Sequence, residues 1–420
     1  MTGSTLTSFD ALLKERYEDN ADFVEKLQFG ENTLLGMLEK RGDSGMVGNK
    51  MPVPIITVLP QGAGKTFSVA QARSNSTTVG ELLLTAGDYH GVVQIGDKVL
   101  KASRTNKGAF LENKMLEIDN LWETCGENLS IYLWGNGGGA LGRRESIAGN
   151  VITLTEPSDA SNFEIGMAIV ASANDGSVST HAILVNSEDV TVVAVNAAAG
   201  TVEISDATDI GSFANGDYLF RKSDFFGDSG SAVLIGVQAF ITATDSPQAL
   251  WGVSAATRAL SPQRWAGCRP SSVAIQGKSI EERLKILVAQ MRSRFKSKTP
   301  DAFFMNPEDM QKLDTTQTST VQRSDKDKET KMGYEALALR TPGGVIPIYE
   351  DRHCPIGQAF AFRMKNHWMT HMDDLLHPQE GDGFTMLRKD ASTDYEFRLL
   401  SYPIYVNNAP INHGRVPLYD

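Results

Sequence analysis

The chain has 420 residues, of which 41% are apolar and 22% charged, and a formal net charge of −11. Single hydrophobic cores stop growing near ~250 to 300 residues, so more than one domain is expected. The sequence has no apolar run near the ~18 residues that cross a bilayer and no long basic stripe, which argues against a membrane protein and against tight binding of DNA phosphates.

Residues 1–45 are predicted to form an arm of short helices. Ser8 and Asn20 are candidate caps for the first pieces, and Asn32 precedes a helical stretch over 33–41 that stops at Gly42. Two or three helical turns are not stable alone, so the arm is expected to dock on another surface. The polar start lacks the basic and apolar regions of a signal peptide, so a cytoplasm-like compartment is expected.

Residues 53–104 are predicted to form a long, mostly β excursion with a weak core of its own. Prolines and β-branched residues open it, a tract rich in Ser, Thr and Gly follows, and a β-type run occupies 90–95. The pattern changes at Gly108, where apolar residues begin to recur at alternating steps of four and three. They are Leu111, Met115, Ile118, Trp122, Cys125, Leu129 and Tyr132. This predicts a helix of about 40 Å over 108–134 with a core-facing stripe, ended by the glycines of 135–139.

The next segment is acidic. Between Glu145 and Phe220 there are 11 acidic residues and no Lys or Arg, which leaves 40 acidic against 40 basic residues in the rest of the chain. Short β-type runs at 151–155, 165–170, 190–195, 201–204 and 218–220 are separated by turn residues. We interpret this segment as an inserted all-β unit, a small barrel or sandwich.

A second helix is predicted after Ser279, because Glu282 completes a Ser-x-x-Glu capping box. Its apolar face consists of Ile280, Leu284, Leu287, Val288, Met291 and Phe295, and four basic residues gather at its C-terminal end. A buried strand is expected at 302–305, then a turn and short helix over 306–313. Residues 314–333 are predicted to be a mobile polar loop, and the chain from Gly343 to be β-rich.

Two stretches resemble catalytic loops. Residues 61–66 resemble a phosphate-binding loop ending in Lys65 and Thr66, but Leu59 stands at the position of its first glycine. A β-type run is expected after Thr66 in place of the helix, so a turn is predicted. Residues 227–233 resemble the nucleophile loop of chymotrypsin-like serine proteases, with Ser229 as the nucleophile. The histidines available upstream, at 90 and 181, lack that family's surroundings, so a glycine-rich turn is expected instead.

No metal or cofactor site is predicted. His367 and His371 would share a helix face, as in a zinc protease, but Trp368 stands where the general-base glutamate is needed. Asp373 and Asp374 are expected to form a solvated turn rather than a catalytic pair. The three cysteines, at 125, 268 and 354, are odd in number and lack metal-ligand spacing, so neither a disulfide framework nor a zinc ribbon is expected.

The order of these parts resembles the tailed-bacteriophage major capsid proteins with the Hong Kong 97-like fold, an α+β fold. The most specific stretches are Asn32-Thr33-Leu34-Leu35 to Met51-Pro52-Val53-Pro54, Ala302 to Leu313, and Gly343-Gly344-Val345-Ile346-Pro347-Ile348-Tyr349. The resemblance covers nearly the whole chain and departs from the family pattern at 145–222, where some relatives carry an inserted β domain.

This resemblance implies a division of the chain. The expected parts are an N-terminal arm (1–60), an extended loop (61–104), a peripheral domain with a spine helix (105–145), the acidic β insert (146–222), a peripheral and axial segment (223–299), an axial domain (300–375) and a peripheral return with the C-terminal tail (376–420). Residues 142–149 and 222–230 are interpreted as surface junctions, so replacing 147–221 by a short linker is expected to leave a foldable subunit.

The resemblance also implies a structural role and no enzymatic activity. The expected protein self-assembles into hexamers and pentamers of an icosahedral shell around double-stranded DNA, in a virion built in the cytoplasm of a bacterial host. Its expected partners are copies of itself, portal, scaffold and possible cement proteins, and the packaged DNA through weak contacts, with no membrane. A serine hydrolase using Ser229 and a phosphate-loop nucleotidase using Lys65 stay open as alternatives.

Overall fold

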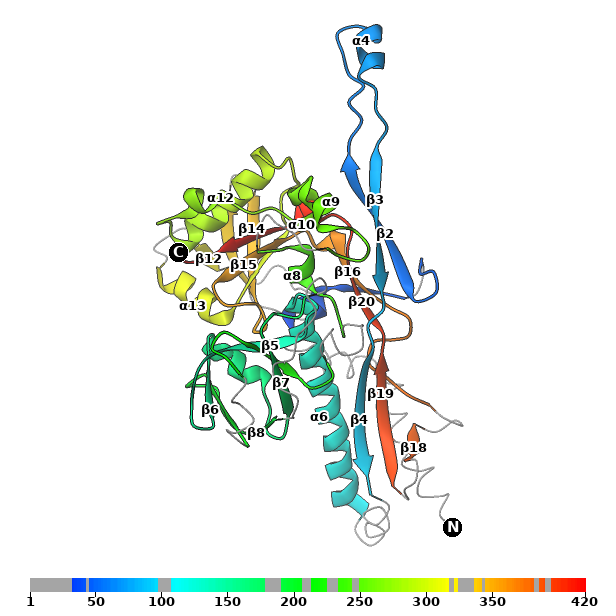
Figure 1. Cartoon of the computed structure of the whole chain (residues 1–420), viewed down its shortest axis with the longest axis vertical. Coiled ribbons are helices and arrows are strands. Elements are labelled where there is room, and N and C mark those ends of the chain that lie inside the picture. The colour runs from blue at the N-terminus through cyan, green and yellow to red at the C-terminus, as the bar shows by residue number, and fades with distance from the viewer. Residues whose placement is uncertain are drawn as a thin grey trace.

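The computed structural model describes residues 32–42, 45–96, 107–177, 190–205, 213–224, 233–243, 249–316, 321–323, 336–341, 344–380, 385–389 and 394–420. In these ranges the protein consists of a helix-and-sheet body, a long hairpin that rises from it, and a separate small barrel (Figure 1). No helix within them is long and apolar enough to cross a membrane.

The body is organised around α6 (Lys107–Trp134), which confirms the predicted long helix. Beside it runs β4 (Tyr89–Ile95), paired antiparallel with β19 (Tyr395–Ser401) (Figure 1). Two short strands, β17 (His377–Pro378) and β18 (Met386–Arg388), also pair with β19. The apolar stripe of α6 faces this sheet closely: a Cβ at Gly91 of β4 would lie 2.8 Å from Cys125 Sγ, so only glycine fits there. From Ile118 to Tyr132 the stripe is therefore core-facing, as predicted, while the side chain of Leu111 lies outside the described residues.

A six-stranded sheet forms the other half of the body. In spatial order its strands are β12 (Val321–Arg323), β13 (Ala336–Thr341), β14 (Gly344–Glu350), β11 (Ala302–Met305), β15 (Gln358–Phe362) and β21 (Gly414–Pro417). The central strand β11 is buried along its whole length, as predicted. Its Phe303 and Met305 join the core beneath α12 (Ile280–Ser293), whereas Phe304 joins the core around α6. The sheet thus links the two main cores.

Helix α12 confirms the predicted capping box: the Ser279 side chain accepts a bond from Glu282 N, and the Glu282 carboxylate accepts one from Ser279 N. The short helix after β11 is α13 (Pro307–Thr316). Within the predicted polar loop 314–333, Val321–Arg323 is a strand rather than a loop, and most of the remainder lies outside the described residues. The other short helices are α8 (Val237–Phe240), α9 (Ala255–Ala259), α10 (Pro262–Ala266), α11 (Ser272–Ile275), η4 (Met364–Asn366) and η5 (Pro410–Asn412).

The arm is predicted to dock on another surface. This prediction is wrong for residues 32–41, which pack within the body of the same chain. Helix α3 (Thr33–Met37) ends earlier than predicted, because the backbone is extended at Leu38 and the chain continues into β1 (Glu39–Arg41). Asn32 precedes the helix but makes no side-chain capping bond. Strand β1 pairs parallel with β16 (His367–His371), which pairs with β20 (Pro403–Asn407). The leucines of this stretch are buried in the body core, so residues 32–41 belong to the chain's own fold. Ser8 and Asn20 lie outside the described residues.

The acidic segment folds into a closed barrel with its own core, not a sandwich (Figure 1). Around the barrel the strands are β10 (Tyr218–Arg221), β5 (Ala140–Ala148), β6 (Val151–Leu154), β9 (Thr201–Ile204), β8 (Val190–Asn196) and β7 (Ala168–Ser172), with η2 (Pro157–Asn162) beside them. The barrel begins at Ala140, inside the part assigned to the peripheral domain. The stretch 142–149, interpreted as a junction, contains most of strand β5, whose Arg144 is buried.

Candidate assembly surfaces

The hairpin is built from β2 (Lys50–Val58) and β3 (Thr78–Thr85), paired antiparallel from Lys50↔Thr85 to Val58↔Thr78. At its base, one face packs into the body core through Val53, Ile55, Leu82 and Leu84. Arg264 of α10 fixes the middle by donating to Thr57 O at 2.5 Å, and Gly80 leaves room for the ring of Trp265. These contacts hold the lower part of the hairpin against the body.

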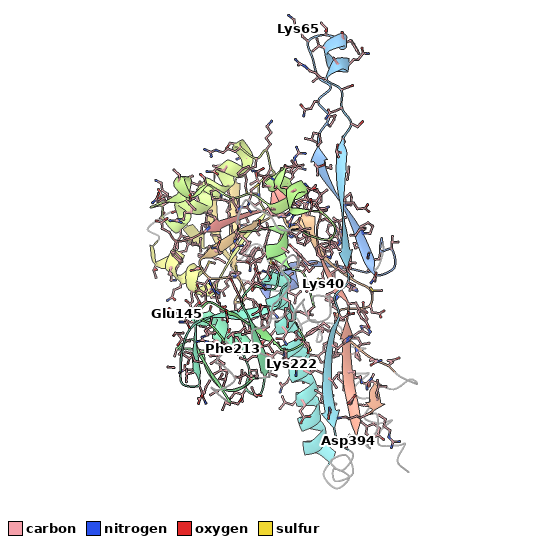
Figure 2. The ribbon with its side chains drawn as sticks, viewed as in Figure 1. Lys40, Lys65, Glu145, Phe213, Lys222 and Asp394 are labelled. Atoms are coloured by element: carbon pink, nitrogen blue, oxygen red, sulfur yellow. The ribbon has the colours of Figure 1, made fainter. Side chains whose placement is uncertain are left out.

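Beyond these contacts the hairpin projects away from the molecule (Figure 2). Its tip, residues 59–77, ends in α4 (Phe67–Ala72), and none of the six residues of α4 is buried. Phe67 is 87% exposed and Leu59 51% exposed. A two-stranded hairpin is marginally stable in water, so a projecting tip with exposed apolar side chains is typical of a segment that binds a partner.

Prolines protect one edge of this hairpin. Pro52 and Pro54 are two residues apart in β2, so their missing N–H groups fall on the same side of the strand. Both lie within the ladder with β3, opposite Leu83 and Glu81, and a ladder tolerates proline where the missing N–H would point away from the partner strand. The loss of these two donors disfavours the addition of a further strand along this edge.

The barrel joins the body at a tight seam. The Asn136 side chain donates to the Asp175 carboxylate at 2.9 Å, and a Cβ at Gly138 would lie 2.1 Å from Asp175 O. Ile131 of α6 packs against the barrel core. The glycine run after α6 thus has two roles. It ends the helix, and it allows the barrel backbone at Asp175 to lie close to the backbone at Gly138.

A second part of the seam is acidic. Glu156 is exposed, and its pKa is raised by partial desolvation and by the negative charges of Asp309 and Glu308 in the first turn of α13. Next to it, in η2, burial raises the pKa of Asp159 to about 7, and Glu156 adds to the shift. Gly142 makes room for this carboxyl, because a Cβ there would lie 3.2 Å from Asp159 Cβ.

Asp159→Asn is expected to stabilise the protein above neutral pH and to have little effect near pH 4. An unfolded aspartate titrates near ~3.9, so the folded protein holds the extra proton between about pH 4 and 7 and loses stability as pH rises through that window. The expected gain at pH 8 is on the order of 1–2 kcal/mol after a discount for partial exposure. Calorimetric unfolding at pH 4 and pH 8 measures it, with the exposed Glu164→Gln as control. A gain of equal size at both pH values would contradict this explanation.

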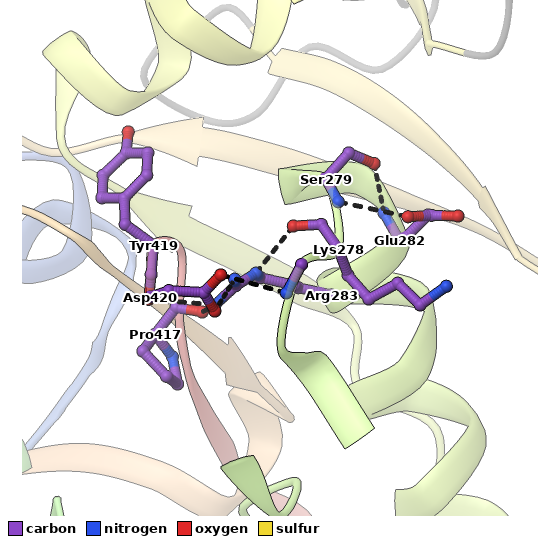
Figure 3. Close-up of polar contacts among 8 residues, drawn as sticks. Lys278, Ser279, Glu282, Arg283, Pro417, Tyr419 and Asp420 are labelled. Atoms are coloured by element: carbon purple, nitrogen blue, oxygen red, sulfur yellow. Dashed lines mark hydrogen bonds and ion pairs between the residues drawn. The ribbon is translucent and has the colours of Figure 1, made fainter. Parts of the chain in front are cut away.

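The last residues of the chain are tied to α12 by one buried guanidinium (Figure 3). Arg283 is 2% exposed and donates to three backbone carbonyls, those of Lys278 at 2.9 Å, Pro417 at 3.2 Å and Tyr419 at 2.9 Å. It also forms a 2.5 Å ion pair with Asp420. This cluster fixes β21 at the edge of the six-stranded sheet.

The residues that resembled catalytic loops are not assembled into a site in the described parts of the chain. Ser229 and His181 lie outside the described residues, and His90 is exposed, with its ring centroid 6.0 Å from that of Tyr402. Lys65 lies at the hairpin tip, far from the body (Figure 2). The expected β-type run after Thr66 is wrong, because Thr66 caps α4 by accepting from Val69 N at 3.3 Å. That helix has only six residues.

His367 and His371 lie on strand β16, so the expectation that they share a helix face is wrong. Both ring nitrogens of His367 are engaged, Nδ1 with Tyr405 Oη at 2.5 Å and Nε2 with His413 Nδ1 at 2.8 Å. Burial lowers the pKa of His367 to about 3 and that of His413 well below its usual value, so both rings are neutral at physiological pH. This buried chain of hydrogen bonds is structural.

Across the described ranges, no three His, Cys, Asp or Glu side chains are grouped so that they could hold a metal ion. Asp373 and Asp374 lie in an exposed turn, where the Asp373 carboxylate is 3.8 Å from His377 Nε2. The three cysteines are buried and unpaired with one another. The features that stand out are therefore surfaces, namely the hairpin tip and the barrel.

No family model and no curated protein matches the sequence. Among solved structures the chain is similar to the Cyanophage A-1(L) capsid asymmetric unit, at 12% identity, with 92% of each chain covered and a TM-score of 0.51. The chain has the Hong Kong 97-like capsid fold. More distant likenesses include the capsid of a native GTA particle, at 8% identity, 94% and 91% coverage and a TM-score of 0.40. The satellite phage P4 procapsid matches at 9% identity, 95% and 99% coverage and a TM-score of 0.39.

Within the Hong Kong 97-like fold, this chain adds a closed barrel between α6 and α8. Its projecting hairpin starts at Lys50, eleven residues before the extended loop drawn from the sequence. The sequence contains a pattern that indicates this earlier start of the hairpin. Val53 and Ile55 in the first strand alternate with outward residues, and so do Leu82 and Leu84 in the second strand.

Proposed function

We propose that this chain is the shell-forming subunit of a tailed-phage capsid, which assembles into hexamers and pentamers of an icosahedral particle around double-stranded DNA. The observation that carries the proposal is the hairpin: in a chain with a capsid fold, it presents an exposed tip with no core of its own. Obligate assemblies bury ~2,000 to 5,000 Å² per interface, so segments lent to neighbouring subunits are expected.

The charge distribution supports the same proposal. Outside 145–220 the chain has equal numbers of acidic and basic residues, which suits an inner wall that faces packed DNA without holding it. The acidic barrel is then best placed on the outside of the shell, away from the phosphates. In this proposal α6 is the spine of the peripheral domain and the six-stranded sheet is the axial domain, in a virion assembled in the host cytoplasm with portal, scaffold and possible cement proteins.

Electron microscopy and sedimentation of the purified full-length chain test the proposal. Closed particles built from fivefold and sixfold capsomers are the expected result. Monomers that persist at high concentration, both alone and with the proteins encoded beside it, would refute a shell-forming role.

Excision of the barrel is expected to leave a foldable body if the cut follows the structure. Phe220 of β10 pairs with Ala140 of β5, so the barrel's two ends lie on neighbouring strands about 5 Å apart. Removing residues 140–221 and joining the ends with a short Gly-Ser linker should therefore give a soluble body, whose far-ultraviolet spectrum shows more helix per residue because the deleted part is all-β. Ile131, which packs on the barrel, is changed to Gln to avoid an exposed patch.

The matched control removes only 147–221, the boundary drawn from sequence. It leaves most of β5 without partners on either side, with Leu141 and Arg144 uncovered. We expect this control to aggregate and the protein that lacks residues 140–221 to stay soluble. Equal solubility of the two proteins would contradict the role given to β5.

A further inference from the structure

The hairpin tip and the barrel carry opposite charge. From Met51 to Gly80 the chain has Lys65 and Arg73 and no acidic residue, whereas the barrel segment 145–220 has acidic residues and no basic one. The two surfaces lie far apart, with Lys65 at the far end of the hairpin and Glu145 and Phe213 in the barrel, on the other side of the body (Figure 2). A chain cannot bring its own tip to its own barrel, so any contact between them joins two copies.

The tip combines this charge with an apolar surface. Phe67 is 87% exposed and Val69 37% exposed, both on α4. Lys65 lies two residues before this helix, ahead of the capping Thr66, and Arg73 immediately follows it. The tip is thus an exposed apolar surface with one basic side chain on each side of α4.

The barrel carries a matching patch. Ile165 is 65% exposed and Val193 49% exposed. The two are neighbours, because Gly166 N donates to Val192 O at 2.8 Å, and Val193 lies at an irregularity in the β8–β9 pairing that turns it outward. Glu164 precedes Ile165, and Glu203 pairs in register with Ala194, so exposed carboxylates border this patch.

We infer that the hairpin tip of one subunit docks on the Ile165–Val193 patch of a neighbouring subunit's barrel, with Lys65 and Arg73 against Glu164 and Glu203. The inference rests on the proposed shell-forming function and gives the inserted barrel a role in it, as the receptor for the hairpin. Apolar contact supplies the affinity and the charges set the orientation and the choice of partner. A nucleic acid would match the two cations of the tip but not its exposed apolar face.

The test uses a disulfide across the proposed contact in the full-length protein. Ser68→Cys on α4 and Val193→Cys on β8 are both exposed positions, and the native cysteines are all buried. Mild oxidation of assembled particles should link most subunits into covalent multimers on a non-reducing gel. The control combines Ser68→Cys with Ser146→Cys on β5, which lies three strands from β8 in either direction around the barrel, and should give no multimers.

A charge exchange gives a second measurement. Lys65→Glu with Arg73→Glu should lower the yield of particles at least tenfold, and adding Glu164→Lys with Glu203→Lys in the same chain should restore it. Particles that form normally but never crosslink at 68–193, or crosslink equally at 68–146, would overturn the docking contact and leave the shell function standing. Loss of packaged DNA in the Lys65→Glu, Arg73→Glu particles with no crosslink at 68–193 would assign the tip to nucleic acid instead. An unmodified chain that forms no particles would refute the proposed function itself.

Discussion

Replacing the hairpin tip, residues 59–77, by a two-residue Asn-Gly turn is expected to abolish shell assembly while leaving the subunit folded. Val58 and Thr78 are paired at the end of the ladder, so a tight turn can close the shortened hairpin. The tip contributes no buried residue of α4 to the body, so its loss should change the free energy of unfolding by less than about 1 kcal/mol. Sedimentation velocity measures assembly, and thermal unfolding by circular dichroism measures the fold.

A Gly-Ser segment of the same length in place of 59–77 is the matched control for this experiment. It keeps the length of the hairpin and removes its surface, including Phe67 and Lys65, so it should fail to assemble as well. If this control forms particles, the length of the hairpin is sufficient for assembly and the side chains of its tip are not needed. Particles from the shortened hairpin would contradict a role of the tip in assembly.

Arg283→Met is expected to lower the free energy of unfolding by roughly 3–5 kcal/mol, since a buried charged donor with several partners is lost. Methionine fills a similar volume but leaves the carbonyls of Lys278, Pro417 and Tyr419 without this donor. The exposed carboxylate of Asp420 contributes little to this loss. Chemical denaturation measures the change, and hydrogen exchange should show faster opening of β21.

Lys285→Met, two residues along the same helix, provides the comparison. Lys285 pairs with Glu281 in a partly exposed i,i+4 ion pair on α12, an arrangement worth less than about 1 kcal/mol. Arg283→Lys should recover only part of the loss, because one ammonium group cannot reach carbonyls on two separate segments. Similar losses for Arg283→Met and Lys285→Met would show that the buried cluster does not anchor the chain end.

Much of the fold was predictable because its signals are local. The four-and-three spacing of apolar residues along α6 and the capping box of Ser279 and Glu282 each act within one or two helical turns. The acidic composition and short β-type runs of 145–220 predicted an inserted all-β unit. From the order of these parts the capsid fold could be inferred without any long-range information.

The candidate surfaces were harder to predict, because exposure depends on what the rest of the chain covers. Val53 and Phe67 belong to the same excursion, yet one is 1% exposed and the other 87%. The sequence marks both as apolar. Only the packing of the hairpin base on the body separates a core residue from a docking residue, so the sequence predicts a turn at the tip and not its exposed surface.

By itself, the sequence determined the helices, most barrel strands and the order of parts, since spacing, capping and turn chemistry operate between near neighbours. The tertiary structure alone decided that residues 32–41 complete the chain's own core, because β1 pairs with β16 more than three hundred residues away. It likewise decided that the barrel closes through β5 and that His367 lies on a strand, since both follow from pairing between distant segments. Such pairing depends on which surfaces meet in three dimensions, and the local pattern of residues does not predict it.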